Sequence, residues 1–187
     1  EEKSNTQWYD LKQLQASKET LLEFVSSAPT HSEAPRLLMN AARLMERNEK
    51  EKEAITLWTR LSDEYPGSYL APEALFLAGV TTYRIGDYAQ ALTFFQRGLL
   101  LISDKEEQAR SYLWIGKTQE KLGNTEAAQS AWQQAQSANP SDYYSVRARD
   151  LLTGTAPFSV PIIYNPETDS AKERADAASW RRITFNL

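Results

Sequence analysis

Small residues recur in this chain at a fixed interval of 37 positions. Ala54, Ala91 and Ala128 are separated by 91 − 54 = 37 and 128 − 91 = 37 residues. The same offset relates three further sets: Trp58, Phe95 and Trp132; Ala42, Gly79 and Gly116; and Glu49, Gly86 and Gly123. A fixed period of about 20 to 50 residues is typical of solenoids built from stacked repeats. We therefore expect a repeat protein, a class that usually serves as a binding scaffold and not as a catalyst.

Each unit has the pattern of two helices, because apolar residues recur at three- and four-residue steps and a breaker divides the unit. In the second unit, Pro72 stands in the first turn of a predicted helix that ends at Tyr83. Gly86 lies in the turn that follows, and a second helix is predicted from Tyr88 to about Leu101. Each unit is therefore predicted to be a helix pair.

Two glycines stand inside predicted helices, where glycine costs about 1 kcal/mol relative to alanine. These are Gly79 and Gly116, one in the first helix of each of two successive units. We interpret them as places where the backbones of paired helices approach closely, with the ring of Phe95 filling the space beyond Gly79.

Two of the units resemble the tetratricopeptide repeat. The residues that carry the resemblance are Pro72, Ala78, Gly79, Gly86, Ala91 and Phe95 in one unit and Ala109, Gly116, Gly123, Ala128, Trp132 and Pro140 in the next. The unit before them matches less well, because Glu49 stands where the turn glycine is expected. The family period is about 34, so a few residues are added per unit here. The resemblance implies an all-α, right-handed superhelix of antiparallel helix pairs.

The pattern predicts two regions. Residues 1–154 hold the repeats: a partial repeat at about 7–34, units at 35–71, 72–108 and 109–140, and an extra helix at 141–154 that Gly154 closes. The first helix of the partial repeat is expected at Gln7 to Gln15. Residues 155–187 form a proline-containing connector, expected to run extended, and a terminal helix from about Pro166 to Phe185.

Composition limits the possible functions. The net charge of −4 and the pI near 5.2 do not indicate a nucleic-acid-binding protein. The absence of cysteine excludes disulfides and thiol chemistry. No run of 18 apolar residues is present, so we expect no direct membrane insertion. The chain begins without methionine and starts and ends inside helical patterns, so we expect a piece of a longer protein. The oligomeric state stays open.

No residue pattern indicates catalysis. The single histidine, His31, has no partner at the spacing of a catalytic triad or a metal site. Adjacent acids such as Glu106 and Glu107 point about 100° apart on a helix and usually form a solvated face. Phosphate-binding loops, nucleophile elbows and zinc spacings are missing. We predict no catalytic residue, no metal site and no cofactor.

A stripe of cations is the one candidate binding feature. Arg36, Arg43 and Arg47 are spaced by 7 and 4 residues, which places them within about 40° of one line on a helix. The positions that lie 37 and 74 residues after these arginines hold several further cations. The candidate ligand-binding residues are Arg36, Arg43, Arg47, Arg84, Arg110, Trp114, Lys117, Lys121 and Arg147. In the resembled family the first helices line the concave surface, so the expected partner is an acidic peptide or protein segment.

A second interpretation needs no ligand. Arg47, Arg84 and Lys121 close their helices, where the helix dipole favours a cation by roughly 0.3 to 1 kcal/mol. For Trp114 and Phe76 we favour packing between repeats over ligand binding. The chain also lacks the asparagines of the carboxylate clamp used by chaperone-binding repeats, so that function is not expected.

A more specific resemblance covers residues 114–152. It runs from Trp114-Ile-Gly-Lys to Pro140-Ser-Asp-Tyr-Tyr-Ser-Val-Arg-Ala148. This stretch is similar to the helical superhelix that precedes the catalytic domain of soluble lytic murein transglycosylases. The catalytic Glu-Ser motif and the Gly-Leu-Met-Gln segment of those enzymes are missing. The resemblance implies a noncatalytic scaffold of a peptidoglycan-cleaving enzyme, located in the periplasm or at the cell surface, with the catalytic domain outside this chain.

An alternative resemblance begins at Glu64-Tyr-Pro-Gly-Ser68 and runs to Phe76. It is similar to extracytoplasmic repeat adaptors that coordinate outer-membrane and envelope assembly. This resemblance implies a protein-interaction module and not part of an enzyme. A lysozyme-like domain after Leu187 in the parent protein would favour the transglycosylase interpretation.

Overall fold

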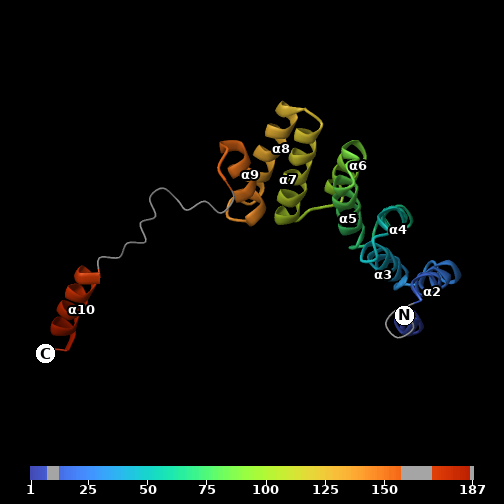
Figure 1. The fold of residues 1–187 in the computed structure, drawn as a ribbon, viewed down its shortest axis with the longest axis horizontal. Helices are drawn as coiled ribbons and strands as arrows, with labels where there is room; N and C mark the ends of the chain where they lie inside the picture. Colours follow the sequence, from blue (N-terminus) through green and yellow to red (C-terminus); the bar gives the residue numbers. More distant parts are fainter. Residues whose placement is uncertain (8–12, 157–169, 186–187) are drawn as a thin grey trace. The chain divides into compact units, whose positions relative to one another are not determined.

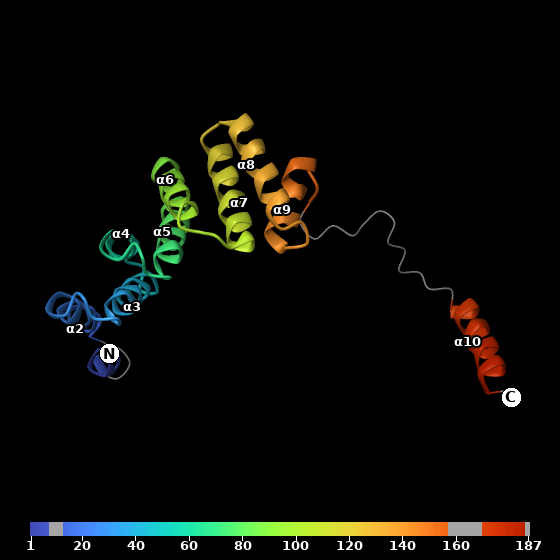
Figure 2. The same ribbon diagram turned by 180° about the vertical axis from the view of Figure 1, so that it is seen from behind.

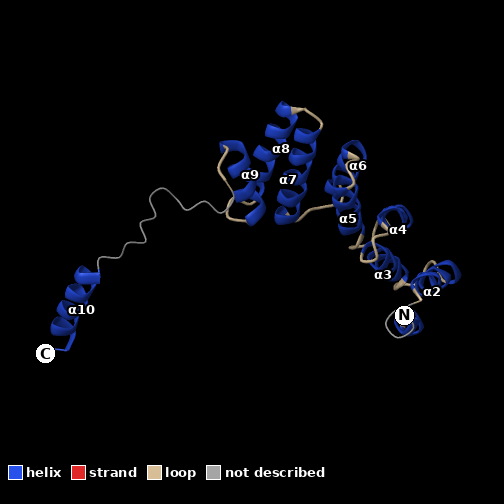
Figure 3. Ribbon diagram, in the orientation of Figure 1, coloured by secondary structure: helices blue, strands red, loops and turns tan. Residues whose placement is uncertain are grey.

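The structure is a computed structural model that describes residues 1–7, 13–156 and 170–185. The described residues are helical and contain no strand (Figure 3). The helices are α1 (Glu2–Asn5), α2 (Leu14–Ser27), α3 (Ala34–Glu46), α4 (Glu51–Glu64), α5 (Ala71–Arg84), α6 (Tyr88–Leu99), α7 (Lys105–Lys121), α8 (Thr125–Ala138), α9 (Tyr143–Thr153) and α10 (Ser170–Phe185). The predicted all-α fold is confirmed.

The chain divides into two units, Glu1–Gly154 and Thr155–Leu187. In the first unit the helices follow one another in chain order from α2 to α9, as two opposite views show (Figures 1 and 2). The packed pairs are α3 with α4, α5 with α6, and α7 with α8; each pair also packs on the next, and α7 reaches α9. In the second unit the structure describes α10. The prolines of the predicted connector, and the predicted start of the last helix, lie outside the described residues.

The small residues of the repeat make the helix pairs possible. Ala54 and Ala91 are fully buried. A Cβ atom added to Gly79 would lie 2.6 Å from Cε1 of Phe95, and one added to Gly116 would lie 2.3 Å from Cδ1 of Trp132. Such distances leave no room for any side chain, because packed carbon atoms sit about 3.5 to 4.0 Å apart. The interpretation of both glycines as close-packing sites is confirmed.

The turns within the pairs use the left-handed backbone conformation. Gly86 has φ of 88° and Gly123 has φ of 81°. Glu49 occupies the corresponding turn between α3 and α4 and takes the same conformation, with φ of 58°. The turn geometry therefore persists where the glycine is absent. The α9 helix ends as predicted on Gly154, which has φ of 69°.

Replacing Glu49 with glycine is expected to raise the free energy of unfolding by on the order of 1 kcal/mol, because a left-handed conformation costs a residue with a Cβ atom roughly 1 to 2 kcal/mol. Urea denaturation measures the change. The control is Lys50→Gly, since the neighbouring Lys50 has an ordinary φ of −108°. A glycine at position 50 is expected to give no gain. Equal effects at both positions would contradict the assignment of strain to Glu49.

Two predicted helix boundaries differ from the structure. The α7 helix begins at Lys105 and not at Ala109, because the Asp104 carboxylate accepts a hydrogen bond of 3.0 Å from the backbone N–H of Glu107 and caps an additional turn. The α6 helix ends at Leu99 and not at Leu101, since the N–H of Leu101 bonds to the carbonyl of Gly98.

The predicted partial repeat at about 7–34 differs more from the structure than these boundaries do. The predicted helix from Gln7 to Gln15 falls partly on residues 8–12, outside the described residues, and Gln15 already lies in α2. The short α1 helix comes before that range. Its Ser4 is buried and donates to the carbonyl of Ser17 on α2 at 3.0 Å, while Ser17 donates back to Ser4 at 2.8 Å. This reciprocal pair of buried hydrogen bonds attaches α1 to α2 without an apolar helix face, which explains why hydrophobic periodicity did not locate it.

Candidate functional site

The helices that carry the predicted cations lie side by side. Arg84 on α5 pairs with Glu46 on α3 at 3.6 Å, and Arg110 on α7 pairs with Glu73 on α5 at 2.9 Å. The α7 helix then packs on α9, which carries Arg147. We call the surface of these eight cations the cationic face; they are Arg36, Arg43, Arg47, Arg84, Arg110, Lys117, Lys121 and Arg147. The structure thus brings the predicted cations onto adjacent helices, and ligand binding there stays a prediction.

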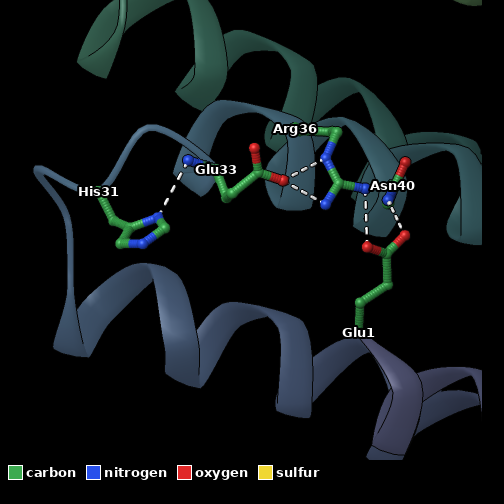
Figure 4. A network of polar contacts seen from close by, with 5 residues as sticks. All are labelled: Glu1, His31, Glu33, Arg36 and Asn40. Atoms are coloured by element: carbon green, nitrogen blue, oxygen red, sulfur yellow. Dashed lines mark hydrogen bonds and ion pairs between the residues drawn. The ribbon is translucent and has the colours of Figure 1, made fainter.

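Half of these cations are paired with carboxylates of the chain. Figure 4 shows Arg36 between Glu33 and Glu1, and the Glu1 contact is 2.7 Å long. These two hydrogen-bonded carboxylates raise the pKa of Arg36 above its ordinary value. Arg84 and Arg110 pair as above, and Arg147 lies 3.6 Å from Asp150. Several of the predicted ligand-binding residues therefore already join one helix to another.

The other four cations have no carboxylate within 4.0 Å among the described residues. They are Arg43, Arg47, Lys117 and Lys121. Arg43 and Arg47 are exposed and line a polar cavity of about 320 Å³ between α3 and the N-terminal helices, with Asn40 and Ser4 in its wall. Lys121 is exposed in the last turn of α7, where the helix dipole already favours it.

Lys117 has the most unusual surroundings of the four. Its ammonium lies 4.2 Å from the ring centre of Trp114 and is half-buried. Burial lowers the pKa of Lys117, and the positive charge of Arg147 lowers it further, while Glu120 raises it. The Nη1 atom of Arg147 is buried without a hydrogen bond among the described residues. The Nε atom of Arg110 is likewise buried without a hydrogen bond to any described residue. Both atoms are buried, so among these groups only the half-buried ammonium of Lys117 is open to an incoming acceptor.

Trp114 serves in packing between repeats. Its ring centre lies 6.1 Å from Phe76, 5.5 Å from Tyr83 and 5.8 Å from Phe95. Arg110 in turn lies over Phe76, with its guanidinium carbon 4.0 Å from the ring centre. The aromatic cluster joins α5, α6 and α7 and gives the nearby cations a rigid support. The packing interpretation of Trp114 and Phe76 fits these contacts.

Sequence reasoning missed the carboxylates that neutralise the face. The ion pair of Glu73 with Arg110 spans 110 − 73 = 37 residues, and that of Glu46 with Arg84 spans 84 − 46 = 38. An acidic residue one repeat before each cation was the available signal. His31 also has a local role: its Nδ1 accepts the backbone N–H of Glu33 at 3.1 Å (Figure 4).

Neither a metal site nor a membrane span is found in the described part of the chain. No group of three or more histidine, cysteine or carboxylate side chains there is placed to hold an ion. The helices there are too short or too polar to cross a bilayer.

Comparison with protein-family models identifies the repeats. Residues 36–68 and residues 109–142 each match a model described as tetratricopeptide repeat. Both segments are therefore similar to the tetratricopeptide repeat, and together they support a helical domain of this kind. A domain built of tetratricopeptide repeats is a scaffold for protein–protein interaction and typically has no catalytic site. Among curated protein sequences, none matches this chain significantly.

Solved structures share this fold at low identity. A crystal structure of MamA has 14% identity and a TM-score of 0.57, covering 79% of this chain and 83% of that one. A tetratricopeptide repeat protein from Parabacteroides merdae has 18% identity and a TM-score of 0.60; the match covers 82% of this chain and 57% of that one. The first tetratricopeptide-repeat domain of Spaghetti (RPAP3), bound to an HSP90 peptide, has 18% identity and a TM-score of 0.54, covering 67% and 92%. At these identities the likeness shows the fold of the tetratricopeptide-repeat domain alone.

Proposed function

We propose that this tetratricopeptide-repeat domain is a noncatalytic scaffold that binds an acidic segment of a peptide or protein partner along the cationic face. The observation that carries the proposal is the set of four cations without a carboxylate within 4.0 Å in the described part of the chain, Lys117 above all. A half-buried ammonium without an ion-pair partner is costly, and an incoming carboxylate would reduce that cost. The RPAP3 domain is bound to the HSP90 peptide SRMEEVD, so a domain of this fold can hold a segment with an acidic end.

A narrower proposal concerns the parent protein. The sequence resemblance of residues 114–152 supports a role as the superhelical scaffold of a peptidoglycan lytic transglycosylase. In that role the domain lies outside the cytoplasm, and the catalytic domain lies elsewhere in the protein. Carboxylates of peptidoglycan stem peptides have the charge that the cationic face would accept.

The alternative is an extracytoplasmic adaptor for cell-envelope assembly, supported by the resemblance of residues 64–76. Both proposals use the same face. They differ in the partner, which is peptidoglycan in the first case and an acidic protein segment in the second.

The test is the binding of a fluorescent peptide that alternates glutamate and alanine. We expect charge reversal of Arg43 and Lys117 together to weaken binding by about tenfold or more, and we expect rising salt to weaken it as well, because the attraction is screened within ~8 Å at physiological salt. The matched control is Lys52→Glu, since Lys52 is an exposed cation on α4 and belongs to no ion pair in the described structure. Salt-independent binding, or an equal loss with Lys52→Glu, would refute the proposal.

Insoluble peptidoglycan serves as the second probe. In the narrower proposal the chain co-sediments with peptidoglycan, the double charge reversal of Arg43 and Lys117 prevents this, and no muropeptides are released. Release of muropeptides that stops when one glutamate is replaced would contradict a noncatalytic scaffold. Binding of the acidic peptide without any co-sedimentation would favour the adaptor.

A further inference from the structure

Large apolar side chains are exposed at one end of the helix pairs. Tyr69 is 83% exposed, Leu100 is 86% exposed and Tyr143 is 59% exposed. Leu101 beside Leu100 is exposed as well. Tyr69 and the two leucines come from the loops between α4 and α5 and between α6 and α7, and Tyr143 begins α9. We call these four residues the loop edge. Single exposed apolar residues are ordinary, but several on one edge indicate a contact surface.

Contacts within the fold place these residues together. Gly98, in the last turn of α6, faces the first turn of α5, since a Cβ atom there would lie 3.6 Å from the carbonyl oxygen of Pro72. Tyr69 and Leu100 therefore lie at the same end of the α5–α6 pair. The side-chain amide of Gln108 donates to the carbonyl of Ile102 at 2.9 Å, which holds the loop that carries the leucines against α7.

The same end of the array continues to α9. A cavity of about 260 Å³ has walls from Asp104 and Glu106 at the start of α7 and from Tyr144 in α9. The ring of Tyr144 lies 5.3 Å from the ring of Tyr143. The residues of the loop edge therefore lie at the same end of three successive repeats.

The charges around this surface are acidic and mostly unpaired. Asp104, Glu106, Glu107 and Asp142 form no ion pair within the described structure, and Lys105 donates to Gln108. Arg110 also lines the cavity, but Glu73 offsets its charge, so four carboxylates and one ammonium leave a local charge of −4 + 1 = −3. Asp104 and Asp142 cap α7 and α9, and the helix dipole favours acids at these positions. Helix capping accounts for the acids, but it gives no reason for exposed leucines and tyrosines beside them.

We propose that the loop edge docks a segment of a protein partner that carries both basic and apolar side chains. Burial of Leu100 and the two tyrosines supplies the apolar contact, and the carboxylates around them attract the cations of the segment. An anionic membrane is disfavoured because the local charge is negative. A second copy of the chain would bring its own carboxylates against these if the two edges met. The inference does not rest on the cationic face. Taken together with the proposed function, it means that the domain joins a basic partner at the loop edge to an acidic partner at the cationic face.

The experiment uses three fluorescent peptides of equal length, one of lysine and leucine, one of glutamate and leucine, and one of lysine and serine. We expect the lysine–leucine peptide to bind at least about tenfold more tightly than either of the others, since only it matches both charge and apolar surface. The Leu100→Ser/Tyr143→Ser variant should lose this preference without any change in circular dichroism, because both side chains are exposed.

Two control variants separate this surface from others. Ile85→Ser/Leu122→Ser removes exposed apolar side chains at the opposite end of the pairs, after α5 and α7. The Arg43→Glu/Lys117→Glu variant alters the cationic face alone. Both should bind the lysine–leucine peptide as the unaltered chain does. An equal loss with Ile85→Ser/Leu122→Ser, equal binding of the glutamate–leucine peptide, or no binding of any peptide would overturn the proposal. Two further results would overturn the proposal. One is a dimer of the unaltered chain that the Leu100→Ser/Tyr143→Ser variant no longer forms. The other is binding of lipid vesicles that the same variant loses.

Discussion

Replacing Gly116 with leucine is expected to destabilise the repeat array by roughly 1 to 3 kcal/mol or more, because overpacking forces neighbouring groups out of their preferred positions. The Cβ atom alone would lie 2.3 Å from both Cδ1 and Nε1 of the Trp132 ring. That ring cannot move away freely, since its Nε1 donates to the carbonyl of Leu113 at 3.3 Å. The α7 and α8 helices must therefore separate.

Urea denaturation measures the loss, and Gly67→Leu is the control. Gly67 has no atom within 4 Å of an added Cβ and no positive φ, so a side chain there meets open space. Alanine at position 116 is a milder variant that removes the helix penalty of glycine, about 1 kcal/mol. If Gly116→Ala still destabilises the chain, steric overlap outweighs that gain. A transition unchanged in both variants at position 116 would show that the α7–α8 contact is misplaced.

Damage at this position should also spread beyond one helix pair. In a repeat array stability is the sum of the units and of their interfaces with neighbours. The α7 helix packs on α6, α8 and α9, so its displacement loosens three interfaces. Hydrogen exchange of the α9 amides is therefore expected to accelerate in the Gly116→Leu variant.

The helix pairs could be predicted from the sequence because their signals are local. Pro72 begins a helix, Gly86 turns the chain and Gly154 ends a helix, and each does so through its own backbone preference. The turn at Glu49 could be placed only by its offset, since glutamate does not favour a positive φ. Hydrophobic periodicity could not locate α1, whose attachment to α2 depends on the polar contact of two serines.

The candidate site was predictable in part for a similar reason. The cations could be found from their spacing along single helices. Whether a cation is paired, and what its helix packs against, depends on contacts between helices one repeat apart, such as Glu73 with Arg110 and Phe76 with Trp114. These contacts follow from the separation and tilt of stacked repeats. A pattern within one unit carries no information on that geometry, so the sequence alone did not distinguish paired Arg110 from unpaired Lys117.

Truncation of Trp58 to alanine is expected to cost about 3 to 5 kcal/mol, the largest effect that we predict for a single side chain. Trp58, on α4, is fully buried in a hydrophobic cluster with residues of α3 and α5, at the position that Phe95 and Trp132 hold in the following units. Against a total stability of about 5 to 15 kcal/mol for a typical domain, such a loss would leave the first repeats close to unfolding.

The large cost of Trp58→Ala follows from the packing around the indole ring. Ala42 stands in α3 where the later units have glycine, and it belongs to the same buried cluster as Trp58. The Nε1 atom of Trp58 has no hydrogen-bond partner within the described structure, so the ring acts through packing alone. Alanine leaves a cavity that the small neighbours cannot fill. Tyr69→Ala is the control, an aromatic truncation at an exposed side chain, which should change the urea midpoint little. Equal midpoints for the two variants would mean that the first repeats do not pack around Trp58.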